Sequence, residues 1–320
     1  MSGDRIRGAF LGLAVGDAAG WPAARHRAAL HAPWSRRLHR ELDAFAEEHR
    51  VTTLPVPFAL NQPVAPLAVG PSDDAEWLAW TLLTVDEPRA AAFRALGPDI
   101  RARISVATAI GNLARGVEPP ASGHDNPHHF DDAAAVRAVA FGALGRDPAE
   151  DAQVTNAGDG LLGARAMALA VAEAVASGSA AEAVRAALTV LPGDTAIGHN
   201  ARLALEVARA AGDPFAAVPA LDAALLDHVY SYGVGAAQTV PVALALAEVS
   251  GGALDRAVPA AACLAALADS APALTGALAG ACGGLAAIPE GWIASARTLA
   301  GCCVPALAGK DLMELTEEFA

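Results

Sequence analysis

Residues 7–20 read RGAFLGLAVGDAAG, a run of small and apolar residues in which Asp17 is the only acid. This run predicts a helix over about residues 4–19. The whole chain shares its character, because 54% of the 320 residues are hydrophobic and only 5% are aromatic. Alanine dominates the apolar fraction and has the highest helix propensity, whereas β-branched and aromatic residues are scarce. We therefore predict an all-α fold, a compact orthogonal bundle of closely packed helices with small contact residues.

Glycine and proline mark the ends of further predicted helices along the chain. No fixed-period repeat or interdomain linker interrupts the pattern, so we predict a single domain over residues 1–320. Two stretches, 51–71 and 117–130, lack helical periodicity and are predicted to be long loops. The predicted helices cover residues 4–19, 36–49, 73–86, 88–97, 99–115, 131–145, 158–177, 179–190, 197–211, 218–228, 235–249, 254–267, 270–287 and 291–299.

The charge balance limits the partners of the chain. Its 22 Lys and Arg residues against 35 Asp and Glu residues give a formal charge of −13. Such a chain does not attract phosphates or anionic lipid, so we predict neither a nucleic-acid nor a membrane partner. The apolar run 271–288 contains Pro272 and several glycines, which favours a packed interior helix over a membrane span.

The four cysteines suggest where the protein resides. They lie in apolar surroundings without a CxxC pair, which predicts reduced, buried thiols rather than a zinc site. Reduced thiols are typical of the cytoplasm, so we predict a cytoplasmic protein. These cysteines are Cys263, Cys282, Cys302 and Cys303.

Two distant helix starts carry acids together with a hydroxyl group. Ser72-Asp73-Asp74 opens one predicted helix, and Asp269-Ser270 opens another nearly two hundred residues later. One interpretation is helix capping, because acids are favourable at the positive end of a helix. The other is a shared site for Mg²⁺, which prefers oxygen ligands. We therefore take Ser72, Asp73, Asp74, Asp269 and Ser270 as candidate metal ligands.

The ordered motifs of the chain, from residue 5 to about 295, resemble the ADP-ribosylglycohydrolase family. The opening run resembles the family's first helix, and Ser72-Asp73-Asp74 stands where the family has Thr-Asp-Asp. Residues 265–270 (AALADS) lie over its Gly-Gly-Asp-Thr-Asp-Thr. Further resemblances are residues 132–144 (DAAAVRAVAFGAL), Thr155-Asn156, residues 238–241 (QTVP), residues 276–281 (GALAGA) and residues 288–292 (IPEGW).

The resemblance implies an all-α body with a binuclear Mg²⁺ centre that cleaves a glycosidic bond at the anomeric carbon of ribose. It makes Asp73, Asp74 and Asp269 the candidate catalytic residues. Tyr230 and Tyr232, with a nearby glycine, indicate either a wall for a flat ring or a packed turn between helices. The full set of candidate substrate-binding residues is Asp17, Asp131, Asp132, Asn156, Tyr230, Tyr232 and Gly233.

The chain departs from the family pattern at working positions. Leu267 replaces the first Asp of the second metal motif and cannot bind a metal, so we expect one Mg²⁺, or two held weakly. Ala24 stands where the family often has a glutamate, and Asn156 where it has a histidine. Glu76 is a weak substitute for that glutamate, and a solvated or capping role suits it better.

The loop before Asp132 has unusual chemistry for a phosphate-binding segment. Residues 124–132 read HDNPHHFDD, and their acids would repel the diphosphate that the family's Gly-rich loop binds. One interpretation is a polar loop whose Asp131 or Asp132 caps the next helix. The other is a binding site for a neutral or cationic substrate or for a late transition metal.

Three functions follow from these observations. The first is Mg²⁺-dependent hydrolysis of an N-glycosidic bond in a ribosylated or nucleoside-like small molecule. The second is a catalytically impaired family member that binds a ligand or a partner protein. The third is an ADP-ribosyl-protein hydrolase that binds phosphate through Arg137 or through arginines of the 25–40 stretch. The oligomeric state is left open.

Overall fold

The structure is a computed structural model that describes residues 2–20, 44, 47, 48, 50, 70–226 and 233–319. Within these ranges every regular element is a helix, and β pairing is confined to two isolated bridges, Asp131 with Gly235 and Thr298 with Asp311. The prediction of an all-α fold is confirmed. The α-helices named below belong to one compact unit made of residues 1–21 and 70–320. The single domain over residues 1–320 stays a prediction.

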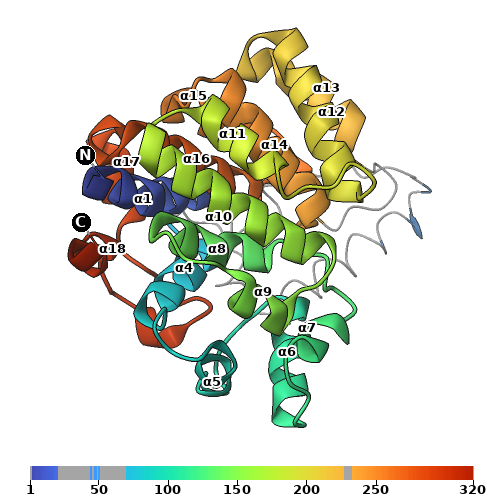
Figure 1. The fold of residues 1–320 in the computed structure, drawn as a ribbon, viewed down its shortest axis with the longest axis vertical. Helices are drawn as coiled ribbons and strands as arrows, with labels where there is room; N and C mark the ends of the chain where they lie inside the picture. Colours follow the sequence, from blue (N-terminus) through green and yellow to red (C-terminus); the bar gives the residue numbers. More distant parts are fainter. Residues whose placement is uncertain are drawn as a thin grey trace. The chain divides into compact units, whose positions relative to one another are not determined.

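Figure 1 shows the helices of the described residues. The α-helices are α1 Ser2–Gly20, α4 Asp73–Leu83, α5 Arg89–Arg94, α6 Ile104–Ala114, α7 Ala121–His124, α8 Ala133–Ala143, α9 Ala149–Thr155, α10 Asp159–Ser177, α11 Ala180–Leu188, α12 Ala196–Ala211, α13 Pro214–Leu225, α14 Ala236–Val249, α15 Leu254–Ala262, α16 Ala271–Gly283, α17 Glu290–Ala296 and α18 Leu312–Leu315. The 3₁₀ helices are η2 Ala265–Leu267, η3 Leu285–Ala287, η4 Pro305–Leu307 and η5 Glu317–Phe319.

The pairing of α1 with α16 is the most extensive contact between two described helices and depends on glycine. The two helices lie side by side (Figure 1). Their glycines face each other across the contact. A Cβ atom built on Gly12 would lie 2.2 Å from the carbonyl oxygen of Gly276, and one on Gly280 would lie 2.0 Å from that of Gly8. Only glycine permits this approach of the backbones. The small residues of the opening run thus allow the first helix to contact one near the end of the chain.

Helix α16 is an interior helix, as the sequence predicts. All of its residues from Ala271 to Cys282 are buried. By length and composition, α10 is the one described helix that is long and apolar enough to cross a membrane, and 56% of its apolar window is buried inside the fold.

Several local predictions are wrong. The helix expected from residue 99 begins at Ile104. Residues 99–103 are not helical, and the backbone N–H of Arg101 donates to the carbonyl of Cys303. The loop expected over 117–130 contains the short helix α7. Only Cys282 is buried among the four cysteines, and Cys263 is exposed. Most of the helix predicted over 36–49 lies outside the described residues, and the described residues 44, 47 and 48 are helical. The loop predicted over 51–71 lies outside them except for residues 70 and 71.

The glycine contact between α1 and α16 generates a stability prediction. Gly12→Ala should lower the free energy of unfolding by about 1–3 kcal/mol, because its methyl group would meet the backbone of α16. The matched control is Gly111→Ala in the middle of α6, where the added carbon has only an ordinary contact with Arg115. The control should be neutral or stabilising, since alanine favours helix. Urea denaturation measures both, and equal effects of the two changes would contradict the packing described.

Candidate functional site

Four helix starts from distant parts of the sequence meet at one place. The residues immediately before α4, α6, α8 and α16 are Ser72, Arg103, Asp132 and Ser270. The carboxylates of Asp73, Asp74, Asp132 and Asp269 gather here, and we call these four residues the acid cluster. Helix N-termini favour negative charge, so the local fold helps to hold these acids together. The sequence-predicted metal motifs at residues 72–74 and 269–270 are therefore brought close in the fold.

The guanidinium of Arg103 lies inside the acid cluster. Its Nη2 donates to Asp74 Oδ1 and to Ser270 Oγ, each at 2.7 Å, and its Nη1 donates to Asp132 Oδ1. The same Nη2 lies 3.4 Å from Asp73 Oδ2 and 3.8 Å from Asp269 Oδ2. A single side chain thus contacts all four carboxylates of the cluster.

Burial and charge together control protonation in the cluster. Burial and the charge of Asp73 raise the pKa of Asp74, although the Arg103 guanidinium opposes this shift. Burial likewise raises the pKa of Asp132 to about 7, again against the effect of Arg103. Burial alone would lower the pKa of Arg103, but the surrounding carboxylates raise it well above its usual value. Arg103 therefore stays charged, and the cluster holds more acid than one cation neutralises.

Asp17, a predicted substrate-binding residue, holds the start of α4 in place. Its Oδ2 accepts the backbone N–H of Ser72 at 2.6 Å and that of Ala75 at 3.1 Å, and its Oδ1 accepts the hydroxyl of Ser72. Burial and the charge of Asp73 raise the pKa of Asp17 to about 7. The Ser72 hydroxyl is thus directed to Asp17 and does not cap α4.

The residues of the cluster do not fit a bound Mg²⁺ in this arrangement. Mg²⁺ requires oxygen ligands at about 2.0–2.1 Å, so neighbouring ligands lie only about 3 Å apart. Among the described residues, no three carboxylates of the cluster come within 4.8 Å of one another. The guanidinium lies between them, and Leu267 is fully buried and offers no ligand. Magnesium dependence therefore stays a prediction from the sequence.

Two other predicted substrate-binding residues brace the chain beside the cluster. The buried side-chain amide of Asn156 donates to the carbonyls of His129 and Asp131 and to Asp131 Oδ1. Asp131 Oδ1 also accepts the backbone N–H of Ala133 at the start of α8, as the capping interpretation predicts. Asp132 makes no such cap, because its Oδ1 bonds to Arg103 instead.

The remaining predicted residues lie at residues 230–233. Tyr230 and Tyr232 fall outside the described residues. Gly233 has a φ of +76°, and a Cβ there would lie 2.8 Å from the carbonyl oxygen of Ala266. Gly233 is thus needed for a turn that passes close to the segment leading to Asp269.

The polar loop before Asp132 is held from inside the fold. The buried amide of Asn126 donates to the carbonyls of Ser105 and Thr155. The ring of His129 contacts the carbonyl of Asn126 and stacks on His124. The amide of Asn126 and one face of the His129 ring are therefore occupied by contacts within the protein.

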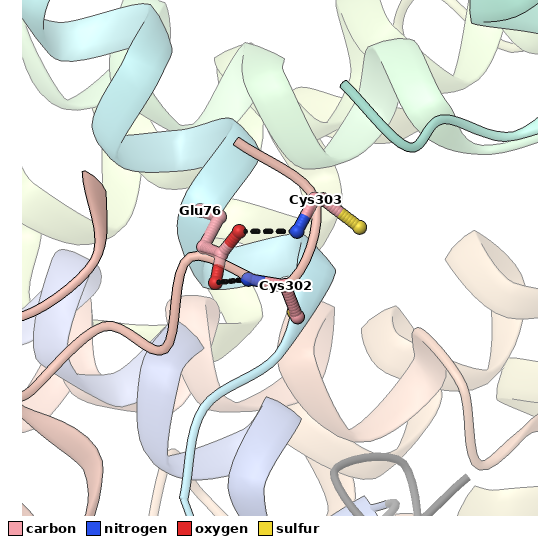
Figure 2. A group of neighbouring side chains, drawn as sticks. All are labelled: Glu76, Cys302 and Cys303. Atoms are coloured by element: carbon pink, nitrogen blue, oxygen red, sulfur yellow. Dashed lines mark hydrogen bonds between the residues drawn. The ribbon is translucent and has the colours of Figure 1, made fainter. Parts of the chain in front are cut away.

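Glu76 has a structural role that the sequence does not reveal. The expectation of a solvated or capping side chain is wrong, because Glu76 is fully buried. Its carboxylate accepts the backbone N–H groups of Cys302 and Cys303, each at 2.7 Å (Figure 2). It also accepts that of Val304 at 2.9 Å. Glu76 thereby fixes the C-terminal turn against α4.

The Cys303 thiol of this turn is not an activated nucleophile. A side-chain hydrogen bond with Cys302, burial and the charge of Asp73 raise the pKa of the Cys303 thiol. A protonated thiol is a poor nucleophile and metal ligand. Among the described residues, Glu76, Cys302 and Cys303 are nevertheless the one group of three acidic, cysteine or histidine side chains whose possible metal-binding atoms all lie within 4.8 Å of one another.

The phosphate-binding role considered for Arg137 is wrong. Arg137 is fully buried and donates to Asp151 at 2.7 Å, to Thr155 at 2.7 Å and to the carbonyl of Ala133. Arg89 bonds to the other oxygen of Asp151, so the acid joins two arginines. No donor of Arg137 is directed to a ligand. The arginines of the 25–40 stretch lie outside the described residues.

Arg103 is the functional residue that sequence reasoning missed. Its partners lie 29 to 167 positions away, so no local pattern links them. One signal was present, however: Leu267 removes a metal ligand while the other acids remain. Buried acids that lose a cation need another one.

The raised pKa values of Asp17 and Asp132 predict how stability depends on pH. Both carboxyls keep their protons in the folded protein up to about pH 7, whereas in the unfolded chain they lose them near pH 3.8. Raising the pH from 5 to 7 should therefore lower the free energy of unfolding, by at most roughly 1.4 kcal/mol per group and pH unit.

Urea denaturation at several pH values measures this slope. Asp132→Asn cannot lose a proton and should flatten the slope. The control Asp86→Asn, at an exposed acid, should leave the slope unchanged. Stability that rises from pH 5 to pH 7 in the wild-type protein would contradict the assignment.

Comparison with known proteins agrees with this fold. No curated protein matches the chain. A solved structure described as an ADP-ribosylglycohydrolase-related protein complex superposes with a TM-score of 0.54 at 19% identity, over 92% of this chain and 93% of that chain. That likeness shows the fold alone. The family model for ADP-ribosylglycohydrolase matches residues 2–320. The chain therefore belongs to the ADP-ribosylglycohydrolase family.

Proposed function

We propose that the chain hydrolyses the N-glycosidic bond of a ribosylated or nucleoside-like small molecule at the acid cluster. The family is a class of glycosyl hydrolases, which supports the general reaction. The observation that carries the proposal is the meeting of the distant acidic turns at residues 72–74 and 269–270 around one position. The side chains of Asp73 and Asp269 are 19% and 26% exposed, so this edge of the cluster is open to a substrate.

The charge of the cluster suits this reaction. Cleavage of the bond between the anomeric carbon and nitrogen passes through an oxocarbenium-like, positively charged transition state. The carboxylates of the cluster lie around one position and would stabilise that state by their negative charge.

Each exposed acid can serve the chemical step. Asp73 or Asp269 would take a proton from water as the water oxygen bonds to the anomeric carbon. The carbon–nitrogen bond then breaks, and its electron pair leaves with the nitrogen, which takes up a proton. No step of this proposal passes through Mg²⁺, and the cytoplasmic location also stays a prediction.

A second candidate function is ligand binding without turnover. It is favoured by the guanidinium inside the cluster together with Leu267, since both changes remove features of a metal-assisted hydrolase. The third function, hydrolysis of ADP-ribosylated protein, loses support because Arg137 is not available for phosphate.

An activity assay separates these functions. Purified protein is incubated with a panel of N-ribosides and with an ADP-ribosyl-arginine peptide, each with and without Mg²⁺. We expect turnover of a riboside and a loss of at least about 100-fold in kcat/KM in Asp73→Asn, because the exposed acid would no longer take a proton.

The exposed variant Asp86→Asn is the matched control and should keep full activity. Turnover of the peptide alone would reject the proposed substrate class. Binding of a riboside without turnover would establish the second function instead.

A further inference from the structure

We infer that the guanidinium of Arg103 takes the place of a metal ion in the acid cluster, so that the folded protein excludes divalent cations from this position. The inference concerns what holds the carboxylates together and does not rest on hydrolysis. It goes beyond the proposed function, because it assigns to this chain an internal cation in place of the cofactor that the family resemblance implies.

The contacts of Arg103 are those expected of a cation that organises a site. Its donors reach Asp74 and Ser270 at 2.7 Å and also bond to Asp132. They lie within 3.8 Å of Asp73 and Asp269. Four of these five partners belong to the set Ser72, Asp73, Asp74, Asp269 and Ser270 that the sequence marks as metal ligands. The guanidinium therefore uses the oxygens that a metal would need.

The space around Arg103 excludes a second cation on its inner side. The cavity bordered by Asp74, Trp77 and Arg103 has a volume of about 10 Å³. This volume is at most that of one water molecule, and a hydrated Mg²⁺ keeps several waters. A divalent ion could reach the shared oxygens only if the guanidinium left.

Leu267 completes the argument. It occupies the position of a family metal ligand but is fully buried in the hydrophobic core. A chain that kept its metal would lose affinity through this change, whereas a chain with an internal guanidinium would not. Leu267 offers no metal ligand, and Arg103 supplies a cation to the remaining acids, so both residues fit an internal cation at this position.

Binding of Mn²⁺ tests the inference without any substrate. The spin-resonance signal of free Mn²⁺ disappears when the ion binds, so a titration gives the dissociation constant. We expect no saturable binding to the wild-type protein at micromolar Mn²⁺. Arg103→Ala opens the position and leaves the carboxylates without a neighbouring positive charge. We therefore expect this variant to bind one Mn²⁺ at least about 100-fold more tightly than the wild-type protein does.

Two further variants locate the gained ion. Arg101→Ala, an exposed neighbour of Arg103 in the sequence, should bind as weakly as the wild-type protein. Adding Asp74→Asn to Arg103→Ala should abolish the gained binding. Mn²⁺ should also raise the Tm of Arg103→Ala by several degrees and leave that of Arg101→Ala unchanged.

Two results would overturn the inference. One is tight, one-to-one Mn²⁺ binding by the wild-type protein that Asp74→Asn abolishes. The other is a folded Arg103→Ala variant that gains no affinity for Mn²⁺. If Arg103→Ala does not fold even with Mn²⁺ present, the wild-type titration decides, and the absence of micromolar binding supports the inference. The Mn²⁺ titrations use no substrate, so a failure to detect hydrolysis in the activity assay would leave this inference standing.

Discussion

The ion cluster around Arg103 is the constraint on which the site depends. Four buried or partly buried carboxylates in one place would repel one another, and the cluster is tolerated because a permanently charged guanidinium lies among them. The planar fork of arginine bonds to Asp74, Asp132 and Ser270 at once, and so joins the starts of α4, α8 and α16 to the residue before α6. The same contacts that assemble the site also stabilise the packing of those helices.

The glycine contact between α1 and α16 makes this assembly possible. It brings the end of α1, which carries Asp17, close to the start of α16, which follows Ser270. Asp17 then accepts hydrogen bonds from Ser72 and Ala75 and sets where α4 begins. Farther along α4, Glu76 holds the C-terminal turn through three backbone N–H groups. The two buried acids therefore tie α4 to both ends of the chain, and the position of Asp73 and Asp74 follows from these bonds.

The family resemblance implies a metal centre among the acids of the site, whereas the structure places an arginine side chain among them. The ADP-ribosylglycohydrolase fold is present, together with most of the acids that the resemblance assigns to its centre. The cation among those acids, however, is a side chain of the protein itself. A guanidinium in place of a metal ion keeps the architecture and the acids of the site, and the site then needs no metal ion from solution to hold those acids together. Burial is the main cause of the raised pKa values of Asp74 and Asp132, neighbouring carboxylates add to it, and the Arg103 guanidinium opposes it.

The sequence by itself determined the helical class, most helix positions and the family. These depend on composition, periodicity and ordered motifs, which are local properties of the chain. It also identified Asp73, Asp74 and Asp269 as residues that share a site. Only the tertiary structure decided that Arg103 lies between them, that Glu76 and Asn156 are braces, and that Arg137 is occupied by Asp151. These roles arise from contacts between residues far apart in the sequence. Residues 99–103, predicted to be helical, are not helical: the backbone N–H of Arg101 donates to Cys303, two hundred positions away, and Arg103 bonds to the acid cluster.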